Sequence, residues 1–241
     1  SERLNQIHTE ALAEFDSIYS AVHAERAQCL EDRRFYSIAG AQWEGPLQQQ
    51  FASKPKMEVN KVHLAIIRIV NEYRNNRISV DFVAKDGGSS DDDLSDVCAK
   101  LYRADEQSPT AQDAYDNAFE EAVSGGIGAW RLRAEYEDDE DDDSECQRVR
   151  FEPIFDADSS VYYDNDARRQ DKADARRCFV LTAMSREAYE TEWGTDSSSW
   201  PRTVRTTQFD WSTPDVVYVC EYYRCEMVKR PIHVYQGLDG Q

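Results

Sequence analysis

Apart from a short alternating segment at 78–84, the spacing of apolar residues in this chain of 241 residues changes from helical to alternating at one point, and that change constrains its fold more than any other feature. Before Gly125-Gly126 apolar residues recur every three or four positions, which is typical of helices with one buried face. Just after these glycines, four apolar residues alternate with charged ones, which is the period of a half-buried strand. They are Trp130, Leu132, Ala134 and Tyr136. The sequence therefore predicts an α+β fold, with a mainly helical region at 1–125 and a β-rich region at 126–241.

Four helices are predicted in the first region. A long helix spans 5–37, and its apolar stripe consists of Leu12, Phe15, Tyr19 and Val22. A second helix covers about 60–76, and a third begins near Asp91, where aspartates favour the positive end of a helix. The fourth has Ser108 as its N-cap and Pro109 in its first position, which is a strong start signal.

The strands are predicted mostly in the second region. The alternating segment that contains Trp130 pairs with 148–155, and the acidic loop 138–147 lies between them. Further strands are predicted at 78–84, 160–163, 178–183, 215–224 and 231–235. A short helix fits 185–193, because Ser185 suits its N-cap.

The most basic part of the chain is the segment 54–77, which includes the helix at about 60–76. Asn60 suits the N-cap of this helix. One buried face is predicted, formed by Val62, Ile66, Ile69, Val70 and Tyr73. The segment has no catalytic signature, and its cations suit pairing with acidic surfaces of a neighbouring subunit. DNA phosphates and solvated local ion pairs are the alternatives. The candidate subunit-interface residues are Lys61, Arg68, Arg74, Arg77 and the loop residue Trp43.

Composition narrows the classes of function. The chain has 28 Lys and Arg against 47 Asp and Glu, a net charge of −19, which argues against extensive coating of DNA. No run approaches the roughly 20 apolar residues of a membrane span, so no membrane partner is predicted. The six cysteines are scattered and have no zinc-ligand spacing, so we interpret them as reduced thiols of an intracellular protein.

Two acidic segments are weighed as metal sites. The run 138–143 lacks the glycine and the ligand spacing of a calcium loop, so a mobile, solvated loop is predicted. Four aspartates further along have the Asp-x-Asp spacing that holds Mg²⁺ or Mn²⁺ in phosphoryl-transfer enzymes. They are Asp156, Asp158, Asp164 and Asp166. Their serine and asparagine neighbours favour turns between strands. No catalytic residue, metal ligand or cofactor is therefore assigned. A metal-dependent nuclease or nucleotidyltransferase that uses these aspartates remains an alternative, as does a non-viral acidic assembly adaptor.

Five blocks of the chain, in order, resemble the N-terminal part of portal proteins from short-tailed, podovirus-type bacteriophages. The basic segment KPKMEVNKVHLAIIRIVNEYRNNR is the most informative of them. The others are 24–45, 78–97, 115–143 and 148–193. Together the blocks cover most of 24–193, and 194–241 adds little to the resemblance.

The resemblance implies a structural protein that forms a dodecameric ring at one capsid vertex of the virion, after assembly in the host bacterial cytoplasm. Double-stranded DNA enters and leaves through the central channel, driven inward by the terminase motor. Coat protein, scaffolding protein and head-to-tail adaptor proteins are the other implied partners. The family's portals do not hydrolyse ATP. Their stem, clip and crown regions are expected beyond Gln241, because the chain resembles only the N-terminal helices and most of the outward wing.

Overall fold

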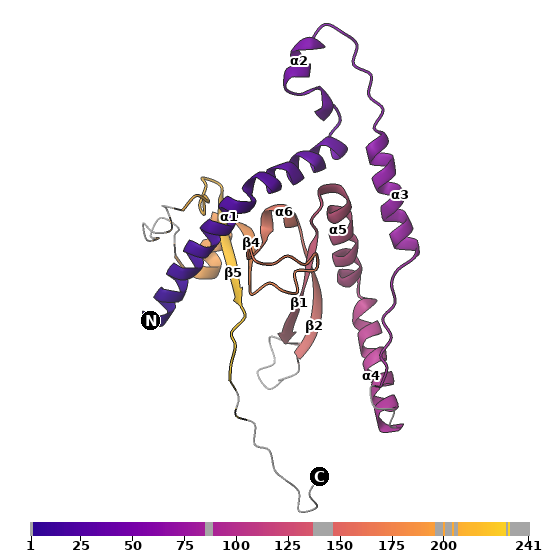
Figure 1. Ribbon diagram of the computed structural model, residues 1–241, viewed down its shortest axis with the longest axis vertical. Coiled ribbons are helices and arrows are strands. Elements are labelled where there is room, and N and C mark those ends of the chain that lie inside the picture. Colours follow the sequence, from indigo (N-terminus) through magenta and orange to yellow (C-terminus); the bar gives the residue numbers. More distant parts are fainter. Residues whose placement is uncertain are drawn as a thin grey trace, which may run out of the picture.

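The computed structural model has the α+β fold that the sequence predicts (Figure 1). It describes residues 2–84, 89–136, 147–195, 200, 204, 207–229 and 231. The helices are α1 (Glu2–Ser37), the 3-10 helix η1 (Ala41–Trp43), α2 (Pro46–Gln50), α3 (Lys61–Asn75), α4 (Ser89–Glu106), α5 (Pro109–Gly125), α6 (Ala157–Ser160) and α7 (Arg186–Trp193). The strands are β1 (Ala129–Tyr136), β2 (Gln147–Ile154), β3 (Val161–Tyr163), β4 (Arg177–Ser185) and β5 (Val216–Arg224).

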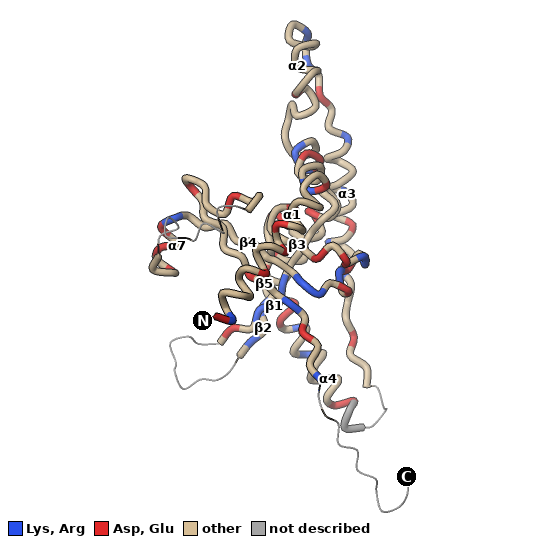
Figure 2. The backbone as a smooth tube through the Cα atoms, turned by 60° about the vertical axis from the view of Figure 1, so that its left-hand side comes forward, with Lys and Arg blue, Asp and Glu red and all other residues tan. Residues whose placement is uncertain are grey.

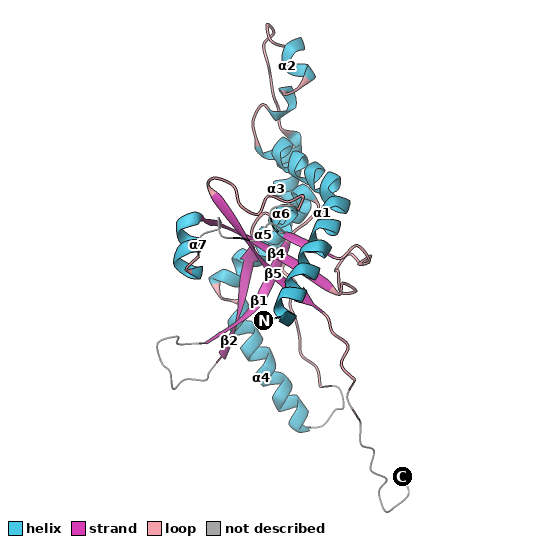
Figure 3. Cartoon of the chain, turned by 90° about the vertical axis from the view of Figure 1, so that its left-hand side faces the viewer, coloured by secondary structure: helices cyan, strands magenta, loops and turns pink. Residues whose placement is uncertain are grey.

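The strands form two antiparallel sheets at the centre of the molecule (Figure 3). β1 pairs with β2 in the predicted hairpin, with Leu132 opposite Phe151. β3, β4 and β5 form the second sheet in that order, and Leu181 of β4 lies opposite Cys220 of β5. The predicted acidic loop falls outside the described residues except for Gln147, which begins β2.

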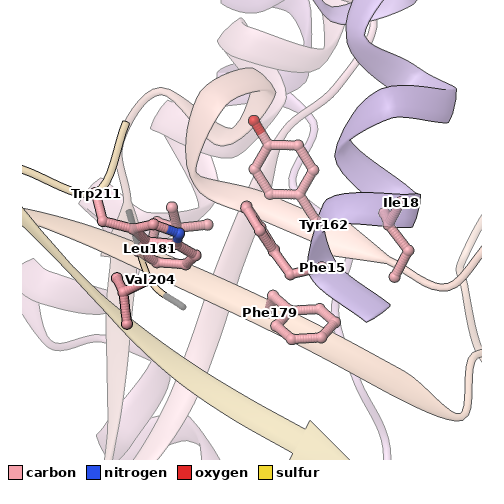
Figure 4. Packing of buried hydrophobic residues seen from close by; sticks show 7 residues of the cluster. All are labelled: Phe15, Ile18, Tyr162, Phe179, Leu181, Val204 and Trp211. Atoms are coloured by element: carbon pink, nitrogen blue, oxygen red, sulfur yellow. The ribbon is translucent and has the colours of Figure 1, made fainter. Parts of the chain in front are cut away.

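The largest core lies between α1 and the three-stranded sheet. Phe15 is only 1% exposed, and its ring centroid lies 5.2 Å from that of Tyr162 and 5.4 Å from that of Phe179 (Figure 4). The other buried residues of this cluster are Ile18, Leu181, Val204 and Trp211. The predicted stripe of the long helix is therefore confirmed, and it joins the first helix of the chain to strands near its other end.

A second core lies between α5 and the β1–β2 hairpin. Ala111 and Ala114 are fully buried against Phe151, because small side chains let the helix approach the strand closely. The approach is closest at Gly128, where a Cβ atom would lie 1.8 Å from the carbonyl oxygen of Ala118. The chain can therefore turn from α5 into β1 here only without a side chain.

Three predicted helix ends are confirmed by their hydrogen bonds and backbone angles. The hydroxyl of Ser108 accepts a hydrogen bond from the backbone N–H of Ala111, and that of Ser185 accepts one from Ala188, both at 3.2 Å. Gly126 ends α5 in the left-handed conformation, with a φ angle of 89°. Gly40, which precedes η1, has a similar φ angle of 86°. Local chemistry therefore sets the ends of these elements.

One predicted strand does not form. Residues 78–84 make no strand. The segment 78–84 instead runs beside α4, where the ring centroid of Phe82 lies 5.8 Å from that of Tyr102. Because none of the described strands lies next to it, its alternating pattern has no described strand to pair with. The strand predicted at 231–235 lies outside the described residues apart from 231.

The apolar faces of α3 and α4 are less buried than their patterns predict. In α3 only Ile66 and Val70 are buried, whereas Val62 and Ile69 are 46% and 48% exposed. In α4 the three apolar residues that define its face are between 51% and 62% exposed, namely Leu94, Val97 and Leu101. Both helices therefore have more apolar surface than the described residues of this chain cover.

Candidate functional site

The basic helix α3 is fixed at its start by the end of α1. The side chain of Asn60 accepts a hydrogen bond from the backbone N–H of His63 at 2.8 Å, which confirms the predicted N-cap. Its amide nitrogen donates to the carbonyl oxygen of Tyr36 in α1, also at 2.8 Å. One side chain thus both begins α3 and ties it to α1.

The inner side of α3 packs on α5. The rings of Tyr73 and Phe119 stack with their centroids 4.1 Å apart. Burial is the main cause that raises the pKa of Tyr73. Arg74 and Arg77 both bind the carboxylate of Asp116, at 3.1 Å and 2.7 Å. These two candidate interface residues are therefore already paired within the chain, and a contact of theirs with another subunit remains a prediction.

The outer face of α3 combines apolar and basic side chains. Lys61, Leu64 and Arg68 follow one another at helical spacing, so they share a face, and Ile67 lies beside them. Leu64 is 65% exposed and Ile67 is 41% exposed. Lys61 and Arg68 are exposed too, and no ion pair to either is found among the described residues. We call these four residues the outer α3 face.

Trp43, the remaining candidate interface residue, is half-buried at the end of η1. Its ring centroid lies 5.1 Å from that of Phe51, and its indole N–H has no hydrogen-bond partner within the described part of the chain. The structure thus places Trp43 in local packing near α2, away from the outer α3 face, and its role at a subunit interface remains a prediction.

Asp156 and Asp158 lie in an ionic cluster that joins α1, α5 and α6. Arg33 donates to both carboxylate oxygens of Asp158, at 3.0 and 2.8 Å, and to Asp156 at 2.8 Å. Asp158 is 1% exposed. Glu121 lies 3.8 Å from Arg33 and accepts the backbone N–H groups of Asp156 and Ala157. Burial opposes the charge of Arg33, but its hydrogen bonds to Asp158 and Asp156 outweigh this effect and raise its pKa.

This cluster gives Asp158 a role that differs from the predicted turn. The sequence pattern did not predict that Arg33 and Glu121 contact the segment around Asp158, because both lie in helices far from it along the chain. The local signal was weak: Glu121 is a charged residue on a helix face that is otherwise small and apolar, and it is buried, whereas Ala122 beside it is exposed.

The other two aspartates do not join the cluster. The carboxylate of Asp164 accepts the backbone N–H of Arg176 at 2.8 Å, which closes the loop between β3 and β4. Within the described residues, no group of three or more His, Cys, Asp or Glu side chains is arranged to hold a metal ion. The geometry therefore gives no support to the nuclease or nucleotidyltransferase alternative.

Comparison with known proteins agrees with the resemblance. The model of the phage P22-like portal protein family matches residues 12–241. The match includes 194–241, where the sequence blocks gave no signal. The chain belongs to the P22-like portal protein family. It is similar to a protein named "Portal protein" from Acyrthosiphon pisum secondary endosymbiont phage 1, with 36% identity over 241 aligned residues.

The P22-like portal family is one of structural proteins of bacteriophages, which confirms the predicted family. The alignment with the aphid-endosymbiont phage portal covers 97% of this chain and 33% of that relative, so this chain spans about a third of the relative's length. No helix in the described ranges is both long and apolar enough to cross a membrane.

Proposed function

We propose that this chain is the N-terminal part of a portal subunit that forms a dodecameric ring at one capsid vertex. The observation that carries the proposal is the match of the P22-like portal family to residues 12–241. Double-stranded DNA passes through the channel of the ring during packaging and ejection. The terminase large subunit, coat protein, scaffolding protein and head-to-tail adaptors contact the ring, which assembles in the host cytoplasm and stays in the virion.

The charge distribution supports an assembly role for this part of the subunit. The outer α3 face places two cations and two exposed apolar side chains on a chain whose net charge is −19. In a ring of identical subunits joined head to tail, two different surfaces of each subunit meet. A basic surface on an otherwise acidic subunit is complementary to many parts of its neighbour, whereas two acidic surfaces would repel each other.

Electron microscopy of the purified full-length protein tests the proposal. We expect rings with a central channel, and mass photometry of the same sample is expected to give one dominant mass of about twelve subunits, since closed point-group symmetry yields a fixed size. A protein that stays monomeric, or that forms open filaments, at all concentrations tested would refute the proposal. A nuclease assay with Mg²⁺ and Mn²⁺ on the same preparation checks the proposal that the ring has no enzymatic activity.

A further inference from the structure

An apolar groove lies at the N-terminal end of α1. It has a volume of about 480 Å³, and its walls include Leu4 and Ile7 of α1, Tyr189 and Trp193 of α7, and Cys220 of β5. Leu4 is 69% exposed and Trp193 is 54% exposed, so apolar surface continues out of the groove onto the molecular surface. Apolar surface of this kind, rimmed by polar residues, is typical of an interaction site.

The rim of this groove along α7 is acidic. Glu190 and Glu192 flank Tyr189 and Trp193 on this helix and are exposed, and neither has an ion-pair partner among the residues that the structure describes. Around the axis of α7, Trp193 lies between these two carboxylates. We call the groove together with this rim the α7 groove. Its character is the reverse of the outer α3 face: apolar and acidic instead of apolar and basic.

α1 holds the two surfaces far apart. Its N-terminal end lines the α7 groove, and its C-terminal end binds Asn60 at the start of α3. At 1.5 Å per residue, the 36 residues of α1 span about 54 Å. In Figures 1 and 2, α3 and the N-terminal end of α1 lie on opposite sides of the molecule, and α7 lies on the side of that N-terminal end. One subunit therefore cannot bring its own outer α3 face into its own α7 groove.

We infer that the outer α3 face of one subunit docks into the α7 groove of the next subunit in the ring. This inference rests on the proposed ring and names the two surfaces that meet in it. Leu64 and Ile67 would enter the apolar groove, as an amphipathic helix does when it binds a groove. Lys61 and Arg68 would pair with Glu190 and Glu192 of α7, which have no ion-pair partner among the described residues.

The charge pattern favours α3 over α4, another helix whose apolar face is largely exposed. Leu94 and Leu101 of α4 are each 62% exposed, so their area alone would suit the groove equally well. However, the first turns of α4 carry Asp92, Asp93 and Asp96, all exposed. Of these carboxylates, that of Asp93 borders the face of Leu94 and Leu101, and it would meet the glutamates of α7 as a like charge, which costs free energy in a water-excluded contact. The outer α3 face instead has the cations Lys61 and Arg68 beside its apolar residues.

A charge-swap experiment in the full-length protein tests the inference. Arg68→Glu and Glu190→Arg are each expected to raise the protein concentration needed for half-assembly by about tenfold or more, because each replaces an attraction by a repulsion. The variant that carries both changes restores the opposite charges across the interface, so it is expected to assemble nearly as the parent does. The losses are expected to be larger at low salt, where screening is weak.

Lys61→Glu and Lys100→Glu provide a matched comparison on two exposed helix positions. Both change the net charge equally, and Lys100 lies on α4, outside the proposed contact. Only Lys61→Glu is expected to weaken assembly. Far-UV circular dichroism of each variant checks that the fold is kept.

The outcomes separate the inference from the proposed function. If the parent forms rings while both single reversals assemble normally, or if the double variant is not rescued, the groove faces another partner and the inference is wrong, although the portal ring stands. If the parent itself forms no ring, the proposed function fails. Loss in both single variants with recovery in the double variant would support the docking of α3 in the α7 groove.

Discussion

Replacing Arg33 by methionine is expected to destabilise this portal chain by about 3–5 kcal/mol, the range found when one partner of a buried ion pair is removed. Asp158 is 1% exposed, and Arg33 is the donor of both hydrogen bonds that its carboxylate accepts. Methionine keeps much of the aliphatic stem that lies against Gly125, so the loss is mainly that of the guanidinium group. The folded state then has to bury a carboxylate without a partner or protonate it.

Asp158→Asn is expected to cost less, about 1–2 kcal/mol, because it removes a charge but leaves a group that accepts hydrogen bonds. Arg33 keeps Asp156 at 2.8 Å and Glu121 at 3.8 Å, and its side chain is 23% exposed, so water also reaches it. Arg33→Met is therefore expected to cost more than Asp158→Asn, because the Asp158 that it leaves without a partner is more deeply buried than Arg33. In the double variant, the cost is expected to be smaller than the sum of the two single costs, because the isolated carboxylate is gone.

Urea unfolding followed by circular dichroism measures these differences. Arg34→Met is the matched control, because the neighbouring guanidinium pairs at 2.9 Å with Glu44 at the surface, where both side chains are more than half exposed. That pair is expected to contribute less than about 1 kcal/mol. An Arg33→Met variant no less stable than Arg34→Met, or an Asp158→Asn variant less stable than Arg33→Met, would refute this account of the cluster.

Three further predictions concern packing, ionisation and catalysis. Gly128→Ala is expected to cost more than about 3 kcal/mol, seen as a large fall in melting temperature, because its new Cβ would overlap the α5 backbone and force the chain to shift. Burial raises the pKa of the Cys220 thiol from 9.0 to about 12, so the folded state holds its proton longer than the unfolded state, and stability is expected to fall as pH rises through this window. Cys220→Ala should reduce that fall in alkaline urea titrations, whereas Cys225→Ala, at an exposed position, should not. The parent protein is expected to show no DNA cleavage with Mg²⁺ or Mn²⁺; cleavage that disappears in both Asp158→Asn and Asp164→Asn would favour the nuclease alternative.

Local chemistry made much of the secondary structure predictable. Ser108 and Ser185 cap their helices through their own hydroxyl groups, and Asn60 does so through its amide. Gly126 ends α5 because a left-handed conformation suits glycine. The β1–β2 hairpin was visible because both strands lie close together in the sequence. Each of these features depends on residues within a few positions or on one short connection.

The predictions that were wrong or incomplete concern features that depend on residues far away in the sequence. The alternation in 78–84 suits a strand, but a strand also needs a neighbour, and this segment lies along a helix instead. The burial of Asp158 could not be foreseen, because Arg33 lies 125 positions earlier in the chain. The apolar pattern of α3 likewise predicted that Val62 and Ile69 are buried, whereas both are exposed. The sequence pattern alone does not show whether an apolar residue is covered by its own chain or left exposed.

The candidate site was predictable in part. The sequence located the basic helix and its cations, but it did not distinguish those that bind within the chain from those that remain exposed. The structure makes this distinction: Arg74 and Arg77 bind Asp116, while Lys61 and Arg68 face outward. The α7 groove was not visible at all, because its walls come from both ends of the chain.

The contact between α1 and the three-stranded sheet also sets the order in which this chain can fold during its synthesis. Glu14 of α1 binds the hydroxyl of Tyr222, which lies 208 positions later. At a bacterial translation rate near 20 residues per second, or a slower one near 5, roughly 10–40 s separate the appearance of these two residues. Throughout this interval the stripe around Phe15 has been made but the strands that cover it have not. Although α1 leaves the ribosome before the strands, it can pack only after they have been made, and its apolar side stays accessible to chaperones until then.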